Sequence, residues 1–338
     1  MGHDAHVMVA ANYPVRQSVR TIDRAPTVRS LLTEKDLADQ FIAAFASRLL
    51  PEKFFYWFPL SVRAWLDLCS DGDYRNYVRS RSLIATSASE LATIVAPGPL
   101  EVLSLGSGQG DKDAILLRAL SGGGRKLRYT PVDTSQALLE MAIVEAGDFG
   151  VPAEGVKADI VEPLHLEALR LPPDAPARLV VLIGNTLGAF DPEGFARTLA
   201  RLLREQDLLL LDGELYSGQE TLAGYDNPVN RRFAWAPLYS VGIRDEDGEL
   251  RFQTAEDGGR PGLYAVTKHF EARRDAQAMM GGQSLQLVAG ERVAMSRSGK
   301  YTQETFVRIL EGAGLSVRWL GRSEDARFVM ALAGLVTG

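Results

Sequence analysis

The chain has 338 residues, of which 46% are hydrophobic, and a formal net charge of -6. This length allows a large buried core, arranged as two domains or as one domain with a long insertion. The longest aliphatic runs, at 179–183 and 208–211, are far shorter than the roughly 20 apolar residues of a membrane-spanning helix. The sequence also lacks a long run of Lys or Arg of the kind that would predict contact with a phosphate backbone. We therefore expect neither a membrane nor nucleic acid as a partner.

The cysteine and histidine content argues against a metal centre. Cys69 is the only cysteine, which excludes an internal disulfide or a thiolate cluster, and none of the four histidines has a partner at ligand spacing. Residues 1–30 lack the apolar segment of a secretory signal. These features predict a cytoplasmic protein without a metal site.

The first ninety residues are expected to be mostly helical. Residues 1–30 show no periodic pattern, whereas 33–50 carry apolar residues at helical spacing, with Thr33 as a candidate N-cap. The stretches 62–69 and 87–95 repeat this helical pattern. The sequence APGP at 96–99 then interrupts it.

Apolar strands and amphipathic helices alternate from residue 100 to residue 214. Because continuously apolar strands separated by helices are typical of a parallel sheet covered on both faces, this pattern predicts a doubly wound α/β domain. The expected strands are 100–105, 127–133, 155–160, 178–184 and 207–214, and the expected helices are 112–120, 135–147, 164–169 and 193–203.

The pattern changes between residues 215 and 297. A helical stretch around 218–240 is followed by runs that alternate apolar and polar residues, as half-buried antiparallel strands do. We interpret this segment as an insertion. An amphipathic helix at 302–314 and two strands at 315–321 and 326–334 follow, and the strands are expected to rejoin the sheet as a hairpin.

A glycine-rich loop follows the first strand of the alternating region. Gly106, Gly108 and Gly110 form G-x-G-x-G, whereas a dinucleotide site requires G-x-G-x-x-G, and Asp111 stands at the expected third glycine. An acidic residue at a helix N-terminus repels pyrophosphate but tolerates a sulfonium or an amino group. The loop therefore favours S-adenosylmethionine (SAM) over NAD, although a simple tight turn would also explain it.

Two aspartates stand at the expected ends of the next two strands. Asp133 lies where a carboxylate can accept both ribose hydroxyls of a nucleoside. Asp159 could accept from the adenine amino group, with Ile160 stacked on the ring. Alternatively, both aspartates only cap the elements that follow them. One departure from this loop type is Ser104, where an acidic residue is usual.

Several motifs together resemble a known family, the SAM-dependent histidine N-alpha-methyltransferases of ergothioneine biosynthesis and their amino-acid methyltransferase relatives. The resemblance runs from about residue 50 to the C-terminus and is carried by LSLGSGQGDK, YTPVDTS, VVLIGNTLGAFDP, GYDNP and SRSGKY.

The resemblance implies a class I Rossmann-like SAM methyltransferase fold, a doubly wound α/β sheet, joined to a second α+β substrate-binding domain. In this chain the implied parts are 1–95, the N-terminal helical part of the substrate domain; 96–214, the Rossmann-like SAM-binding domain; 215–297, the inserted part of the substrate domain; and 298–338, the helix and strand pair that complete the sheet.

The implied cofactor is SAM. Lys112 would pair with its methionyl carboxylate, a role that fits a lysine placed unfavourably in the first turn of a helix. Gly110 and Ile160 also belong to the expected cofactor site, because Gly110 is part of the glycine-rich loop and Ile160 follows the aspartate at the end of the third strand. The full set of expected cofactor residues is Gly106, Ser107, Gly108, Gly110, Lys112, Asp133, Asp159, Ile160 and Thr186.

The same resemblance implies an acceptor site. Tyr56 and Tyr74 match tyrosines that contact the substrate and are the candidate catalytic residues, while Tyr225 matches the tyrosine that binds the substrate carboxylate. Ser298 and Lys300 are retained.

Two positions of the acceptor site depart from the family. Ala189 replaces the asparagine that holds the α-amino group, and Ser296 replaces the acidic residue that binds the imidazole. Because sites that hydrogen-bond a polar group discriminate by factors of about 10⁴ or more, losing both groups should remove a preference for histidine.

The sequence therefore predicts a SAM-dependent methyltransferase that acts on a free amino acid or a close analogue. The methyl group would go to nitrogen or to a thioether sulfur, as in methionine, where aromatic residues 54–58 could stabilise the new cation. The alternatives are a SAM-binding or nucleoside-binding protein without catalysis and an NAD-dependent oxidoreductase. A monomer or a homodimer is expected.

Overall fold

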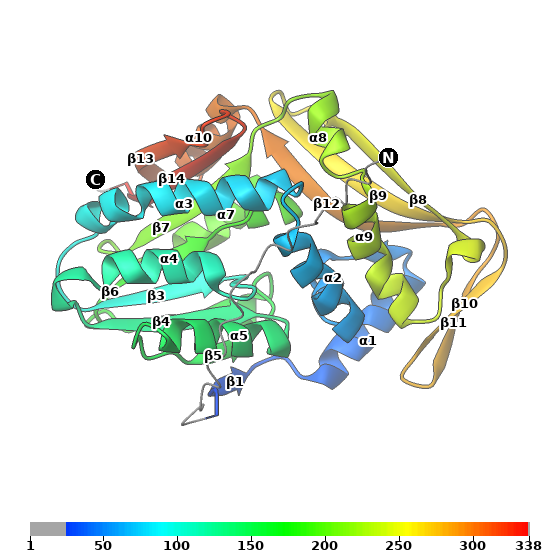
Figure 1. Cartoon of the computed structure of the whole chain (residues 1–338), viewed down its shortest axis with the longest axis horizontal. Coiled ribbons are helices and arrows are strands. Elements are labelled where there is room, and N and C mark those ends of the chain that lie inside the picture. The colour runs from blue at the N-terminus through cyan, green and yellow to red at the C-terminus, as the bar shows by residue number, and fades with distance from the viewer. Residues whose placement is uncertain (1–24, 337–338) are drawn as a thin grey trace, which may run out of the picture.

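The computed structural model describes residues 25–336, and its largest element is a mostly parallel sheet of eight strands (Figure 1). Its strand order is β1-β5-β4-β3-β6-β7-β14-β13. The strands are β1 (Val28–Ser30), β5 (Gly155–Lys157), β4 (Leu127–Asp133), β3 (Leu100–Leu105), β6 (Ala177–Leu182), β7 (Leu208–Glu214), β14 (Phe328–Leu335) and β13 (Leu315–Arg322). The predicted hairpin is confirmed, because β14 pairs antiparallel with both β13 and β7.

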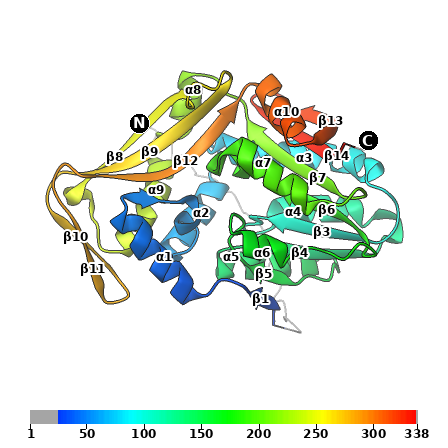
Figure 2. The same cartoon turned by 180° about the vertical axis from the view of Figure 1, so that it is seen from behind.

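Helices cover both faces of this sheet, as the apolar strands require. One face packs against α3 (Arg75–Ile94), α4 (Asp111–Leu120) and α5 (Gln136–Gly147). The other face packs against α6 (Pro163–Glu167), α7 (Pro192–Leu202) and α10 (Gln303–Gly312), which Figure 2 shows from behind. The strand order reverses at β3, so the loops after β3, β4 and β6 meet at one edge, where folds of this kind bind ligands.

A second unit stands beside this edge and has its own aromatic core. Its sheet has the order β2-β12-β9-β8, in which β2 is Leu49–Leu50, β12 Arg292–Tyr301, β9 Leu263–Ala272 and β8 Gly248–Glu256. The hairpin of β10 (Ala276–Met280) and β11 (Gln283–Leu287) extends from it. The surrounding helices are α1 (Glu34–Ala46), η1 (Glu52–Phe55), α2 (Pro59–Ser70), α8 (Gln219–Ala223) and α9 (Pro228–Ser240).

Three observations correct the predicted division of the chain. The N-terminal part is not confined to the second unit, because β1 extends the large sheet by pairing with β5 and α3 packs on that sheet. The boundary at 297/298 cuts β12, which lies entirely in the smaller sheet. The third predicted strand ends at Lys157, so Asp159 lies in the following loop. Residues 1–24, expected to be irregular, lie outside the described residues.

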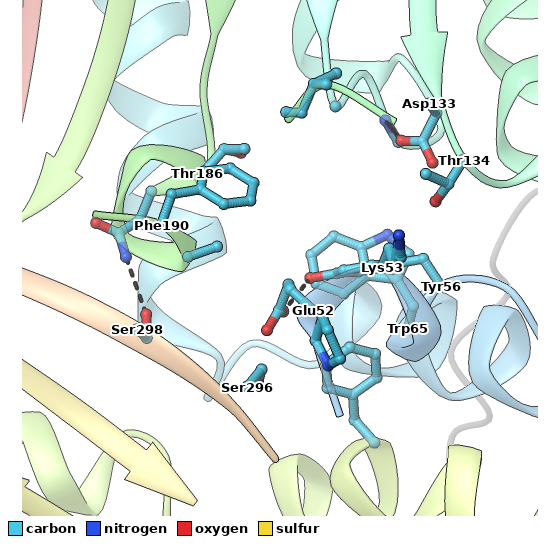
Figure 3. Close-up of a pocket in the computed structure, with 18 of the residues that line it drawn as sticks. Glu52, Lys53, Tyr56, Trp65, Asp133, Thr134, Thr186, Phe190, Ser296 and Ser298 are labelled. Carbon is cyan, nitrogen blue, oxygen red and sulfur yellow. Dashed lines mark hydrogen bonds between the residues drawn. The ribbon is translucent and has the colours of Figure 1, made fainter. Parts of the chain in front are cut away.

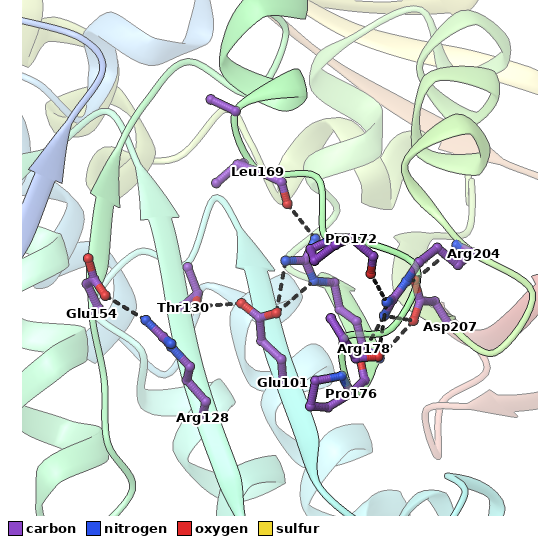
Figure 4. A network of polar contacts seen from close by, with 12 residues as sticks. Glu101, Arg128, Thr130, Glu154, Leu169, Pro172, Pro176, Arg178, Arg204 and Asp207 are labelled. Atoms are coloured by element: carbon purple, nitrogen blue, oxygen red, sulfur yellow. Dashed lines mark hydrogen bonds and ion pairs between the residues drawn. The ribbon is translucent and has the colours of Figure 1, made fainter.

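A network of ion pairs stabilises the opposite, amino-terminal ends of the central strands (Figure 4). Arg178 at the start of β6 donates to Glu101 of β3 at 2.9 Å and to the carbonyl of Leu169 at 2.6 Å. Asp207 accepts from the Arg178 backbone N–H at 2.8 Å and from Arg204. Because Arg178 is only 3% exposed, these contacts keep a buried charge paired. They lie at the edge of the sheet opposite the loops that follow β3, β4 and β6.

Among the described residues, no helix has the length and apolar character needed to cross a membrane.

Candidate active site

A cavity of about 300 Å³ lies between the carboxyl edge of the large sheet and the second unit. Both halves of the predicted site line it. The cofactor-side residues are Gly106, Ser107, Gly108, Lys112, Asp133, Asp159, Ile160 and Thr186, and the acceptor-side residues are Tyr56, Tyr74, Ala189, Tyr225, Ser296 and Ser298. In Figure 3 Asp133 and Thr134 lie at one end of the cavity, and Glu52, Ser296 and Ser298 lie toward the other.

The loop after β3 and the end of β4 form one rigid arrangement. The backbone N–H of Gly108, which has a φ of 55°, donates to Asp133 at 3.0 Å, and that of Ser135 donates to its other oxygen at 2.9 Å. Burial raises the pKa of Asp133, while these hydrogen bonds lower it. Since a carboxylate can accept about four hydrogen bonds, Asp133 keeps lone pairs for hydroxyl groups in the cavity.

Two polar groups at this end have no hydrogen-bond partner among residues 25–336. The ammonium of Lys112 lies 5.5 Å from the ring centroid of Tyr77 and makes no ion pair there. The indole N–H of Trp65 is buried without an acceptor and lies near Gly108. Each of them would be satisfied by a carboxylate or carbonyl oxygen of a bound ligand.

Asp159 has a different environment from the one expected. It forms an ion pair with Lys53 of η1 at 2.6 Å and accepts from the backbone N–H of Val161 at 3.1 Å. Its carboxylate thus links the large sheet to the second unit, and its contact with adenine stays a prediction. Ile160 is buried and lies close to Gly106, while the hydroxyl of Thr186 donates to the carbonyl of Ile183 at 2.9 Å.

Gly110 is the one predicted cofactor residue that does not line the cavity. It begins α4 with a φ of 78°, and a Cβ at this position would lie 2.7 Å from the Cα of Ala142 in α5. Its role is therefore in helix packing beneath the loop.

At the acceptor end, two hydroxyl groups accept hydrogen bonds from nitrogen donors, and Figure 3 shows one of these contacts, to Ser298. The buried ammonium of Lys300 donates to the hydroxyls of Tyr225 and Ser298, each at 2.7 Å. Asn76 also donates to Tyr225 at 3.0 Å, and Asn185 donates to Ser298 at 3.0 Å. Because both oxygens already accept two hydrogen bonds, their own hydrogens are directed elsewhere: the Tyr225 hydroxyl donates to Glu214 at 3.2 Å, and the two hydroxyl oxygens lie 3.0 Å apart, within hydrogen-bond distance of each other.

Glu214 at the end of β7 neutralises this group. Its carboxylate lies 2.8 Å from the ammonium of Lys300 and 3.2 Å from the hydroxyl of Tyr225. Burial lowers the pKa of Lys300, whereas Glu214 raises it. The Tyr225 and Ser298 hydroxyls thus face the cavity with a paired cation behind them, an arrangement suited to an organic carboxylate.

The two candidate catalytic tyrosines also line the cavity. Burial raises the pKa of both Tyr56 and Tyr74 well above the ordinary value, so neither forms a phenolate near neutral pH. Tyr56 donates to the carboxylate of Glu52 at 3.0 Å, and its ring packs against Trp65 and Phe233. A neutral phenol is a poor base, so the predicted role of these tyrosines is limited to orienting other groups.

The aromatic run 54–58 mostly serves as core. Phe54 and Phe55 are fully buried and Phe58 nearly so, and of the whole run only Tyr56 lines the cavity.

Sequence reasoning missed several residues of the cavity and its surroundings. Glu214 carried a recognisable signal, since it ends a strand as Asp133 does. Asn76, Glu52 and Lys268 gave none, because they come from distant segments that only the fold brings together.

The comparisons with known proteins agree with this geometry. The profile of the family described as "Histidine-specific methyltransferase, SAM-dependent" matches residues 34–334. The chain is 31% identical over 269 residues to the histidine N-alpha-methyltransferase of Mycobacterium tuberculosis, covering 76% of this chain and 79% of the relative. This chain belongs to the histidine-specific, SAM-dependent methyltransferase family.

A further relative of this methyltransferase is the N-methyltransferase imqF of Aspergillus flavus, 20% identical over 92% of this chain and 87% of the relative. The family membership identifies the fold as class I Rossmann-like and SAM as the methyl donor, as the sequence predicts. Bound SAM supplies an electrophilic methyl group on a sulfonium. The residues of this chain hold and align the reacting groups, and such alignment can lower a barrier by about 7–11 kcal/mol.

Proposed function

We propose that this methyltransferase transfers the methyl group to the amino group of a free amino acid or a close analogue. The observation that carries the proposal is the pair of hydroxyls of Tyr225 and Ser298, which face the cavity with Lys300 2.7 Å behind each of them. The two hydroxyls bond to one another at 3.0 Å, and Tyr225 also bonds to Glu214, so the α-carboxylate that every free amino acid carries would bind by replacing these contacts beside the buried cation.

The carboxylate of Glu52 supports nitrogen as the methyl acceptor. An ammonium group must lose a proton before its lone pair can attack, whereas a thioether loses none. Glu52 lines the cavity, is oriented by the hydroxyl of Tyr56 at 3.0 Å, and is a better base than the tyrosines. We propose that the carboxylate of Glu52 accepts the proton that the acceptor ammonium loses. Methylation of a thioether sulfur would leave this carboxylate without a role.

Two positions support an acceptor other than histidine. Ala189 and Ser296 both line the cavity, where a hydrogen-bonding amide and a carboxylate would be needed to hold the amino group and the imidazole. An alanine side chain makes no hydrogen bond, and a serine brings no charge to pair with imidazolium.

The test is a product analysis with methyl-labelled SAM and a panel of free amino acids. We expect S-adenosylhomocysteine and an N-methylated product with at least one of them, and less with histidine. Glu52→Gln should lower kcat by about 100-fold or more if Glu52 takes the proton, with the affinity for SAM unchanged in calorimetry. Histidine as the best acceptor, or a methylated sulfur as the main product, would overturn the proposal.

A further inference from the structure

Lys268 is a lysine in the cavity for which the described part of the chain provides no counter-ion. It lies on β9, and its ammonium is 4.1 Å from the ring centroid of Phe55 and 5.5 Å from that of Phe233. No carboxylate of the described residues lies within ion-pairing distance, and no hydrogen bond satisfies it there. Burial lowers the pKa of this ammonium, and the charge of Glu52, at longer range, raises it. The side chain is only partly exposed, and its ammonium contacts aromatic rings but no anion, so a bound anion would compensate its charge more fully.

The strand register places Lys268 at a defined distance from the proposed carboxylate site. Ser298 on β12 pairs with Val266 on β9, and Lys268 is two residues further along the same face. Two residues of a strand span about 6–7 Å. Ser298, Val266 and Lys268 all line the cavity. This separation matches the distance between the backbone end of an amino acid and the tip of a medium-length side chain.

The side chains that strand pairing and ring contacts place next to Lys268 are apolar or neutral. Phe252 pairs with it on the neighbouring strand β8, Phe233 covers it from α9, and Ser296 lies on β12 near the bulge beside its partner Met295. In a subsite of this kind a neutral side chain would leave the ammonium uncompensated. A carboxylate would pair with it, and the aromatic rings beside the ammonium reduce its contact with water and strengthen the attraction.

The charges of the acceptor end then match one class of ligand. The α-carboxylate lies on Tyr225 and Ser298, and the ammonium on Glu52. Lys268 is the remaining cation of this end that has no ion-pair partner among the described residues. Resting on the proposed function, we propose that Lys268 selects an acceptor amino acid whose side chain ends in a carboxylate, of the size of aspartate or glutamate.

The experiment compares glutamate with its isosteric amide, glutamine, in the wild type and in Lys268→Met. We expect kcat/KM of the wild type to favour glutamate by about 30-fold or more, the effect of one desolvated charge pair. Lys268→Met should remove this preference mainly by raising KM for glutamate, with glutamine changed by less than about threefold. Lys268→Arg should keep much of the preference.

Two controls accompany this comparison. The exposed Lys126 gives the matched variant Lys126→Met, which should behave as the wild type. Should Lys268→Met not fold, calorimetric titration of the wild type with glutamate and glutamine, in the presence of S-adenosylhomocysteine, measures the same preference by binding.

Each outcome has a separate meaning. Equal use of glutamate and glutamine by the wild type, or an equal loss of kcat with both in Lys268→Met, would overturn the inference, the latter in favour of a base or a structural role. If no amino acid is methylated although SAM binds, the proposed function itself fails.

Discussion

Lys112 is the residue whose charge bears most directly on the methyl donor. Its ammonium lies in the first turn of α4 without an ion pair among the described residues, and it lines the cavity beside the loop of Gly106 and Gly108. A cation near a helix N-terminus is unfavourable in itself. Its charge acts at longer range on the buried Asp212, whose pKa it lowers, but it makes no ion pair, and a bound carboxylate would supply one.

Replacing this lysine should weaken SAM binding. We expect Lys112→Met to raise the Kd for SAM by about 30-fold or more, since it removes one partner of a desolvated charge pair. Isothermal titration calorimetry measures this, with Lys126→Met as the control and the melting temperature as a check of folding. An unchanged Kd would show that the carboxylate of SAM binds elsewhere.

Asp113, a buried acidic residue beside the glycine-rich loop, lies next to Ser104, the position where this loop type usually has an acidic residue. Ser104 is buried beside Asp113 and Tyr129. Tyr129 donates to Asp113 at 2.5 Å, and burial raises the pKa of Asp113 to about 6. The acid is thus supplied by the first turn of α4 instead of the strand, and it faces the core and not the cavity.

At the scale of elements, the position of α4 depends on one glycine. Gly110 has a left-handed backbone, and its hydrogen lies against the backbone of Ala142, so α4 and α5 approach closely there. A side chain at this point must push the two helices apart. The loop above them carries the backbone N–H that holds Asp133.

Gly110→Ala should therefore be costly although Gly110 does not touch the cavity. We expect the free energy of unfolding to fall by about 2 kcal/mol or more, from strain and overpacking together, and SAM binding to weaken. Urea unfolding measures the first effect. Gly122→Ala is the matched control, because no atom lies within 4 Å of a Cβ there. Equal stability of the two variants would contradict this account.

At the scale of the whole molecule, the second unit is assembled from separate parts of the chain. Its core combines Phe41, Phe45 and Phe54 with Phe270 and other residues of the insertion, and β2 pairs with β12. The large sheet is likewise completed only by β1 and by the final hairpin. Neither unit corresponds to one continuous segment.

The insertion should consequently not fold by itself. We expect a fragment of residues 215–301 to be unfolded, because it lacks the aromatic residues from α1 and η1 that fill its core. Far-ultraviolet circular dichroism and the dispersion of amide proton shifts report this, with the whole chain as the reference. A well-dispersed spectrum of the fragment would contradict the prediction.

The sequence by itself determined the elements of the large sheet and the chemistry at its strand ends. The strands 100–105 and 127–133 agree with β3 and β4 to the residue, because continuous apolar runs specify buried strands locally. The loop from Gly106 to Lys112, followed by Asp133, was predictable for the same reason: parallel strands bring their carboxyl ends to one edge.

Only the tertiary structure decided which charges line the cavity. Lys268 and Glu52 are more than 200 residues apart, and each is an unremarkable charged residue in its own segment. The register of β9 with β12 and the packing of η1 against α9 bring them to the same cavity. Burial and charge pairing depend on contacts distant in sequence, and local periodicity carries no information about such contacts.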